Sequence, residues 1–221
     1  MTTTMPRSLR ADAQDNRDRV VEAARGLFAR DGLEVPMRAI AEQAGVATAT
    51  LYRRFPTKQT LVLEVFAHQL RACRGIVRSA VGDPDPWRAF SGIVERVLVL
   101  NARNQGFTDA FFAAFPGAFD VAAHRTEILQ DVSAIARRAI AAGRLRPDFA
   151  LDDFTLVLLA GRGLASAGAD ARVAAARRFA AIAVDGFRQG DSNGALPPRA
   201  RVVQPAAGPM HPRGTGPRTA P

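Results

Sequence analysis

Apolar residues recur at the spacing of an α-helix along almost the whole chain, and this pattern constrains the fold more than any other feature. Runs of alternating Val, Ile and Thr between turn residues, which would indicate strands, are almost absent. Apolar residues make up 48% of the 221 residues, enough to build a buried core and too many for a largely disordered chain. The sequence therefore predicts an all-α protein.

Several classes of protein are excluded by what the sequence lacks. No run approaches about 18 consecutive apolar residues, so no membrane-spanning helix is expected. The first residues lack the apolar stretch of a signal peptide, which predicts a cytoplasmic protein. Cys73 stands alone, and His68, His124 and His211 have no paired spacing, so we expect no disulfide framework, no metal site and no cofactor. A phosphate-binding loop and a Gly-x-Ser-x-Gly motif are also absent, and no enzymatic activity is expected.

Glycine and proline divide the chain into three parts. A first helix is expected to begin near Asp12 or Asp15, either of which would cap it. Together with two short helices it forms a small helical domain over residues 12–58. A larger helical domain follows over residues 59–189. From residue 190 to 221 prolines and glycines crowd together, which predicts a disordered tail.

The larger domain contains several further helical segments. Helices are predicted over residues 87–104, 119–142, 151–164 and 173–187, with a short aromatic-rich segment at 106–115. The segment 151–164 is apolar on nearly every side, so it needs cover on two sides, which favours packing against a second subunit. The polar residues near the end of the 87–104 helix are expected to be solvated or to cap it: Asn101, Arg103, Asn104 and Gln105.

Residues 36–54 have the pattern of a helix-turn-helix. Pro36 suits the start of a short helix, and Gly45 falls where a tight turn needs unusual backbone angles. Ala41 is small where the two helices cross. Apolar residues expected to face a miniature core are Ile40, Val46, Leu51 and Phe55. Three ordinary core helices remain the competing interpretation, because glycine turns between helices are common.

The residues left on the outer side of this motif are chemically suited to DNA. Hydroxyl, methyl and guanidinium groups that match base edges and phosphates are carried by Thr48, Ala49, Thr50, Arg53 and Arg54. Further candidates for phosphate contacts are Arg38, Tyr52 and Lys58. The net charge of +9 permits an anionic partner but does not establish one. Lys58 is the only lysine, and the abundance of Arg and Ala is also typical of a GC-rich genome.

The motif resembles the DNA-binding domain of the TetR/AcrR transcriptional regulators. The resemblance extends from about residue 15 to 66 and rests on PMRAIAEQAGV at 36–46 and TLYRRFPTK at 50–58. Residues 85–87 and 142–148 are similar to the ligand-binding domain of one subgroup. The family resemblance implies a homodimer, mostly a repressor, that leaves its operator when a small molecule fills the C-terminal domain. Two-fold symmetry implies a palindromic operator.

The sequence departs from the family pattern at four positions. Pro36 and Ala47 stand where family members often have a capping Ser or Thr. Thr48 is therefore a candidate cap of the third helix, and in that role its hydroxyl would be less free to contact DNA. Ala49 occupies a position often held by glycine, and its methyl group suits contact with a thymine methyl. Arg54 replaces a frequent histidine and adds positive charge near the DNA backbone.

Aromatic residues of the larger domain are candidates for an effector pocket. The set consists of Trp87, Phe90, Phe107, Phe111 and Phe112, with His124 and Arg162 as polar groups within apolar walls. Such walls favour a hydrophobic or aromatic effector, whose identity the sequence does not give. For each single aromatic residue, plain core packing is the stronger interpretation.

A binding effector is expected to tilt the helix that starts after Thr57 and joins the two domains, which would change the separation of the two recognition helices.

One alternative function is a helical small-molecule-binding or enzymatic protein whose DNA-binding domain is non-functional. An activator instead of a repressor is another. Attachment to a membrane surface is disfavoured, because the apolar helix faces are needed for the core.

Overall fold

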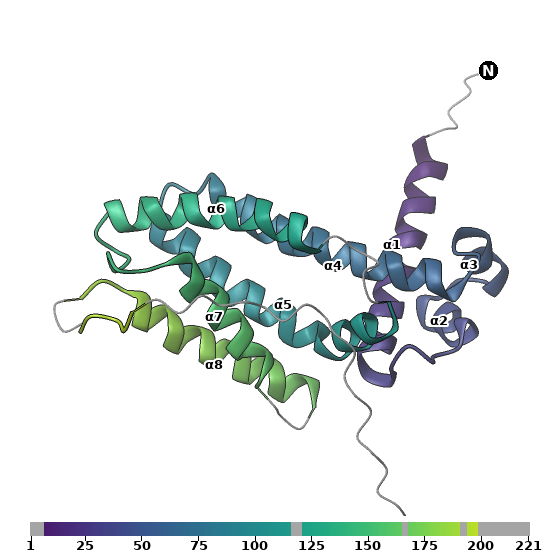
Figure 1. Ribbon diagram of the computed structural model, residues 1–221. Coiled ribbons are helices and arrows are strands. Elements are labelled where there is room, and N and C mark those ends of the chain that lie inside the picture. Colours follow the sequence, from purple (N-terminus) through teal and green to yellow (C-terminus); the bar gives the residue numbers. More distant parts are fainter. Residues whose placement is uncertain (1–6, 116–120, 165–167, 191–193, 199–221) are drawn as a thin grey trace, which may run out of the picture.

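The computed structural model describes residues 7–115, 121–164, 168–190 and 194–198, with side chains from residue 14 and, in the second range, from residue 126 (Figure 1). Within these residues the chain forms eight helices and one isolated antiparallel bridge, between Leu145 and Arg188, so the all-α prediction is confirmed. The helices are α1 (Arg7–Asp31), α2 (Met37–Ala44), α3 (Thr48–Arg54), α4 (Lys58–Val81), α5 (Pro86–Ala114), α6 (Val121–Ala141), α7 (Leu151–Arg162) and α8 (Ala169–Phe187).

Several helix bounds differ from the prediction. The first helix begins at Arg7, not near Asp12 or Asp15, because the residues before these aspartates are compatible with a helix and need no cap there. The last helix begins at Ala169, earlier than the predicted residue 173. Residue 119, the predicted start of the sixth helix, lies outside the described residues.

The predicted break in front of the aromatic segment 106–115 is wrong. The helix α5 runs without interruption through Gly106 to Ala114. The glycine serves close packing instead of ending the helix, since a Cβ atom at Gly106 would lie 2.7 Å from the carbonyl oxygen of Ala29 in α1. The backbones of α1 and α5 therefore touch at this point.

The helices pack around α5, which contacts α1, α4, α6, α7 and α8. In Figure 1 α1, α2 and α3 gather at one end of the molecule, while α6, α7 and α8 surround α5 towards the other end, and α4 connects the two regions. No helix in the described residues is long and apolar enough to cross a membrane.

Two hydrophobic cores fill the molecule, and they do not separate at residue 58. The first core combines α1, α2 and α3 with the start of α4, as far as Phe66, and with Phe107 and Phe111 near the end of α5. The second core lies between the rest of α4 and α5 and the helices α6, α7 and α8. The N-terminal head of the molecule, by which we mean the elements of the first core, thus includes parts of α4 and α5.

The stretch that begins at residue 190 also differs from the predicted tail. Arg146 is 7% exposed and ion-paired with Asp148, and its Nη2 donates to the carbonyl oxygen of Gly194 at 2.7 Å. The amide of Leu196 donates to Asp148 Oδ2 at 3.0 Å. Residues 194–198 are therefore held against the α6–α7 loop, while the prediction for residues 199–221 lies outside the described part.

Candidate DNA-binding surface

The turn between α2 and α3 has the geometry of a tight helix-turn-helix. Gly45 has a φ of 65°, in the left-handed region that glycine adopts without strain. Its amide donates to Glu42 O at 3.1 Å, and the amide of Val46 donates to Ala41 O at 3.0 Å, which closes the end of α2. Ala41 is buried between the helices, as predicted for a small residue at the crossing.

The helix α3 divides into a buried and an exposed side. Leu51 is 0% exposed and Phe55, which follows the helix, is 5% exposed, so both anchor α3 in the first core. The residues on the other side are exposed, except Thr50, which is half-buried: Thr48, Ala49, Thr50, Tyr52, Arg53 and Arg54. Tyr52, with 47% exposure, is an unusually open aromatic residue.

Thr48 is not the cap of α3. The residue before the helix is Ala47, in an extended conformation and without a side-chain hydrogen bond to the helix end. Thr48 is already the first helical residue, so the expectation that it replaces a capping Ser or Thr is wrong. Its hydroxyl group thus remains on the exposed side of α3.

Thr57 and Thr60 fix the start of α4 beside this surface. The Thr57 hydroxyl accepts from the Thr60 amide at 3.1 Å, and the Thr57 amide donates to Thr60 Oγ1 at 3.3 Å, so the two residues form a capping box at the predicted start of this helix. Lys58 is the first residue of α4 and is half-buried. The capping box thereby sets the position of this ammonium group relative to α3.

The cations of the head fall into two groups. Three arginines of α1 are matched with acids, Arg17 with Glu64 at 2.6 Å, Arg25 with Glu22, and Arg30 with Asp31 at 2.7 Å, while Arg19 bonds to the neutral Asn16 Oδ1. Within the described part of the chain no acidic partner is found for the cations of α2, α3 and the start of α4, which are Arg38, Arg53, Arg54 and Lys58. Unmatched, exposed guanidinium groups beside hydroxyl groups suit a polyanion.

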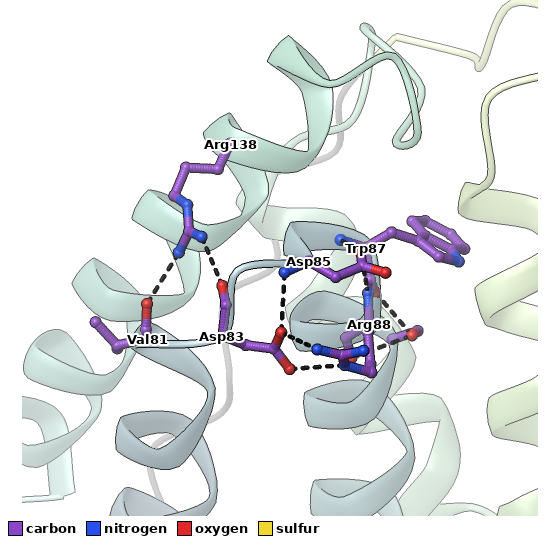
Figure 2. Close-up of polar contacts among 7 residues, drawn as sticks. Val81, Asp83, Asp85, Trp87, Arg88 and Arg138 are labelled. Atoms are coloured by element: carbon purple, nitrogen blue, oxygen red, sulfur yellow. Dashed lines mark hydrogen bonds and ion pairs between the residues drawn. The ribbon is translucent and has the colours of Figure 1, made fainter.

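The far end of α4 is tied to α5 and α6 by polar contacts that the sequence analysis did not identify (Figure 2). Arg138 in α6 donates to the carbonyl oxygens of Val81 at 2.9 Å and Asp83 at 2.6 Å. The Asp83 carboxylate accepts from Arg88 Nη2 at 2.6 Å, and this bond lowers the pKa of Asp83. Asp85 caps α5 by accepting from the Trp87 amide at 3.0 Å. The sequence signal for this cap was the Asp-Pro pair at the start of the helix.

The candidate effector residues lie in two separate places. Trp87 and Phe90 belong to the second core, with ring centroids 6.2 Å apart. Phe107, Phe111 and Phe112 belong to or pack against the first core, next to α1 and α4. The structure thus does not bring the five aromatic residues together around one pocket.

The two polar candidates do not join an apolar cavity either. Arg162 is ion-paired with Asp109 at 2.8 Å, and its side chain is 42% exposed, so it lies at the surface between α7 and α5. This corrects the expectation of a polar group within apolar walls. His124 lies in α6, where its side chain is outside the described residues. Among the described residues no group of three or more His, Cys, Asp or Glu side chains is placed to hold a metal ion.

Asn104 is a buried polar residue that the sequence analysis placed wrongly at a solvated helix end. It lies inside α5, is 1% exposed, and its Oδ1 accepts from Arg25 Nη1 in α1 at 2.9 Å. The sequence offered no signal for this contact, because the two residues are far apart in the chain.

The geometry defines a helix-turn-helix DNA-binding protein with a second helical domain, and the comparisons agree. Residues 20–65 match the family described as "Bacterial regulatory proteins, tetR family". The HTH-type transcriptional repressor KstR of Mycobacterium tuberculosis is 31% identical over 144 residues, which cover 63% of this chain and 66% of that repressor. The KstR repressor of Mycolicibacterium smegmatis is 33% identical over 110 residues, which cover 48% of this chain and 54% of that protein. The chain thus spans between about half and two thirds of the length of these relatives.

Solved structures match over nearly their whole length. The TetR transcription regulatory protein from Mycobacterium vanbaalenii is 33% identical, with a TM-score of 0.60, and the match covers 81% of this chain and 99% of that one. The regulator SCO0520 from Streptomyces coelicolor is 28% identical, with a TM-score of 0.65, over 78% of this chain and 98% of that one. The chain belongs to the TetR family of bacterial transcriptional regulators.

Proposed function

We propose that this regulator is a repressor that binds a palindromic operator as a homodimer and leaves it when a small hydrophobic or aromatic effector binds the C-terminal domain. It has no enzymatic role in this proposal, and it acts in the cytoplasm, where its DNA is. The observation that carries the proposal is the set of cations on and beside α3, Arg38, Arg53, Arg54 and Lys58, for which the described residues hold no acidic partner.

The exposed residues of α3 divide by chemistry into two roles. Thr48, Ala49, Thr50 and Arg53 are proposed to contact base edges in the major groove, where hydroxyl, methyl and guanidinium groups distinguish base pairs. Phosphate contacts, which position the head and are independent of sequence, are proposed for Arg38, Tyr52, Arg54 and Lys58.

The homodimer is proposed to form through α7 and α8. Only Phe154 and Thr155 are buried in α7, although this helix is largely apolar, and Leu156 is 52% exposed. Ile182 in α8 is 62% exposed. A second copy would cover both side chains, and the two-fold axis would then place two α3 helices against a palindrome.

The effector is proposed to enter the second core near Trp87 and Phe90. Its apolar surface would replace side-chain contacts in this core. Because Arg138 holds the far end of α4, a displacement inside the core would turn α4 about this end and shift Lys58 and α3. Phe107, Phe111 and Phe112 would carry the same displacement through α5 into the head.

Selection of bound fragments from sheared genomic DNA at about 150 mM salt tests the proposal. We expect enrichment of a palindrome by the full-length protein and loss of the enrichment in the double variant Arg53→Ala, Arg54→Ala. The matched control removes the same charge far from α3, with Arg78→Ala and Arg144→Ala, which are both exposed. A folded dimer that enriches no sequence would contradict the proposal.

A further inference from the structure

The helices α1 and α5 cross with their backbones in contact. A Cβ atom added at Gly106 would lie 2.7 Å from the carbonyl oxygen of Ala29, so no side chain separates the two helices there. The angle between two packed helices is usually set by rows of side chains on one helix that fit between rows on the other. At Gly106 no side chain takes part in such a fit. The angle must then be set by the contacts that flank the crossing.

Among the described residues, a ring contact and a hydrogen bond join side chains of α1 and α5 beside the crossing. The rings of Phe28 and Phe107 stack with centroids 5.9 Å apart and planes inclined by 16°. Both rings are fully buried, so this contact supplies apolar packing on one side of the crossing. The other contact is the hydrogen bond from Arg25 Nη1 to Asn104 Oδ1, at 2.9 Å. A hydrogen bond weakens steeply when its donor angle changes, and this one is assisted by the charge of the guanidinium.

The Arg25–Asn104 bond is held rigidly at both ends. On the α1 side, Glu22 is ion-paired with Arg25. On the α5 side, Asn104 Nδ2 donates to Leu100 O at 2.7 Å, and the Thr108 hydroxyl donates to Asn104 O at 3.0 Å. The same Thr108 hydroxyl accepts from Gln69 Nε2 at 3.0 Å, which brings α4 into the network. Asn104 is 1% exposed, so water does not replace the bond with Arg25 at low cost.

We propose that Asn104, through Arg25, is a positioning residue for DNA binding, because it fixes the angle of α1, against which α2 packs, relative to α5 and thereby the spacing of the two α3 helices in the dimer. The effect of Asn104 on the choice of operator rests on the function proposed above. Asn104 touches no DNA in this arrangement; it selects the distance between half-sites that the dimer accepts.

The first test measures the orientation of the head without DNA. Spin labels are attached to Ala49→Cys in α3 and Arg144→Cys in the α6–α7 loop, which are both exposed positions. Cys73→Ser removes the native thiol, and excess unlabelled protein ensures that a dimer contains one labelled chain at most. We expect the distribution of distances between the labels to broaden in Asn104→Ala and in Arg25→Ala. Arg25→Lys, which keeps a charged donor, should restore a narrow distribution. An unchanged distribution in both alanine variants would overturn the proposal, whether or not the protein binds a palindrome.

The second test measures which half-site spacing the dimer tolerates. The selected palindrome is compared with versions that carry one extra or one missing base pair at the centre. The ratio of the affinities for the selected and the altered spacings should be about tenfold smaller in the variants than in the wild-type protein. This is the effect of one charge-assisted hydrogen bond. Equal discrimination in wild type and variants would overturn the proposal.

Gln105→Ala is the matched control for both tests. This neighbour of Asn104 bonds to α7 instead of α1, since its Nε2 donates to Arg162 O at 2.7 Å. We expect wild-type label distances and wild-type spacing preference in this variant. If Gln105→Ala broadened the distances as much as Asn104→Ala, general loosening of α5 would explain the effect and the proposal would fail.

Discussion

The ring of Phe111 in α5 stacks on the ring of Phe66 in α4, with centroids 3.9 Å apart and planes inclined by only 4°. Phe111 is 0% exposed and Phe66 is 2% exposed, and both belong to the core of the DNA-binding head. The last turns of α5 therefore stabilise the head, although Phe111 follows Phe66 by 45 residues in the chain. A change at this point acts on DNA binding through folding of the head.

Phe111→Ala should destabilise the protein strongly. Removal of a fully buried phenylalanine ring leaves a cavity, and the expected loss is about 3–5 kcal/mol in the free energy of unfolding. Urea denaturation followed by circular dichroism measures it. Phe112→Ala is the control, since its ring is only partly buried and meets Phe111 edge-on. A loss below about 1 kcal/mol in Phe111→Ala would show that its ring is not a core element.

The fold was largely predictable from local sequence signals. Pro36 and Gly45 marked the two ends of the short helix α2, and Thr57 marked the start of α4, because capping and left-handed turns depend on the residue at the turn itself. The division of α3 into buried Leu51 and exposed Arg53 followed from helical periodicity.

The remaining features depend on contacts between distant parts of the chain. The helix was predicted to end before residue 106, because the sequence does not show that Ala29 lies against Gly106. For the same reason Asn104 was taken for a solvated residue and not for the partner of Arg25. The five aromatic candidates for an effector pocket share a residue type, and residue type alone did not reveal that they divide between two cores.

Gly106→Ala and Gly92→Ala form a matched pair in α5 with opposite expected effects. The new methyl group at residue 106 would meet the Ala29 carbonyl, and the forced shift should cost about 1–3 kcal/mol in the free energy of unfolding. At residue 92 no atom lies within 4 Å of the added Cβ, so alanine should stabilise the helix by about 0.5–1 kcal/mol. Chemical denaturation of both variants gives the comparison. Equal effects of the two substitutions would argue against a close α1–α5 contact.

Leu156→Glu and Ile182→Glu should convert the dimer to monomers without unfolding the chain. Both side chains are more than half exposed in the single chain, so a charge there is tolerated by the fold. At an interface the same charge would be buried without a partner, and the dimer dissociation constant should rise by about a hundredfold or more. Sedimentation velocity over a concentration series measures this. Val81→Glu, at a similarly exposed apolar residue of α4, should leave the dimer intact.

Asp148 should make the protein sensitive to acid in a defined range of pH. The Arg146 guanidinium, together with the Leu196 amide, lowers the pKa of this carboxyl from 3.8 to about 2 in the folded chain. The unfolded chain therefore takes up the proton first, so the stabilisation is complete above pH 3.8 and is lost as the pH falls towards 2. Asp148→Asn removes the titrating group, and its free energy of unfolding should fall less over this range than that of the wild type. Parallel curves for both proteins, measured by urea denaturation at each pH, would contradict the Asp148 pairing.

Lys58→Ala should weaken DNA binding and make it less dependent on salt. If the ammonium at the start of α4 contacts a phosphate, its removal prevents the release of about one counterion, and the slope of log K against log salt should decrease by about 0.9. Because phosphates carry no sequence information, the loss should be similar for the operator and for unrelated DNA. Fluorescence anisotropy with labelled duplexes between about 50 and 200 mM salt gives both quantities. Arg78→Ala, which removes one charge near the opposite end of α4, should keep the wild-type slope. A common slope for Lys58→Ala and the wild type would place Lys58 outside the DNA contact.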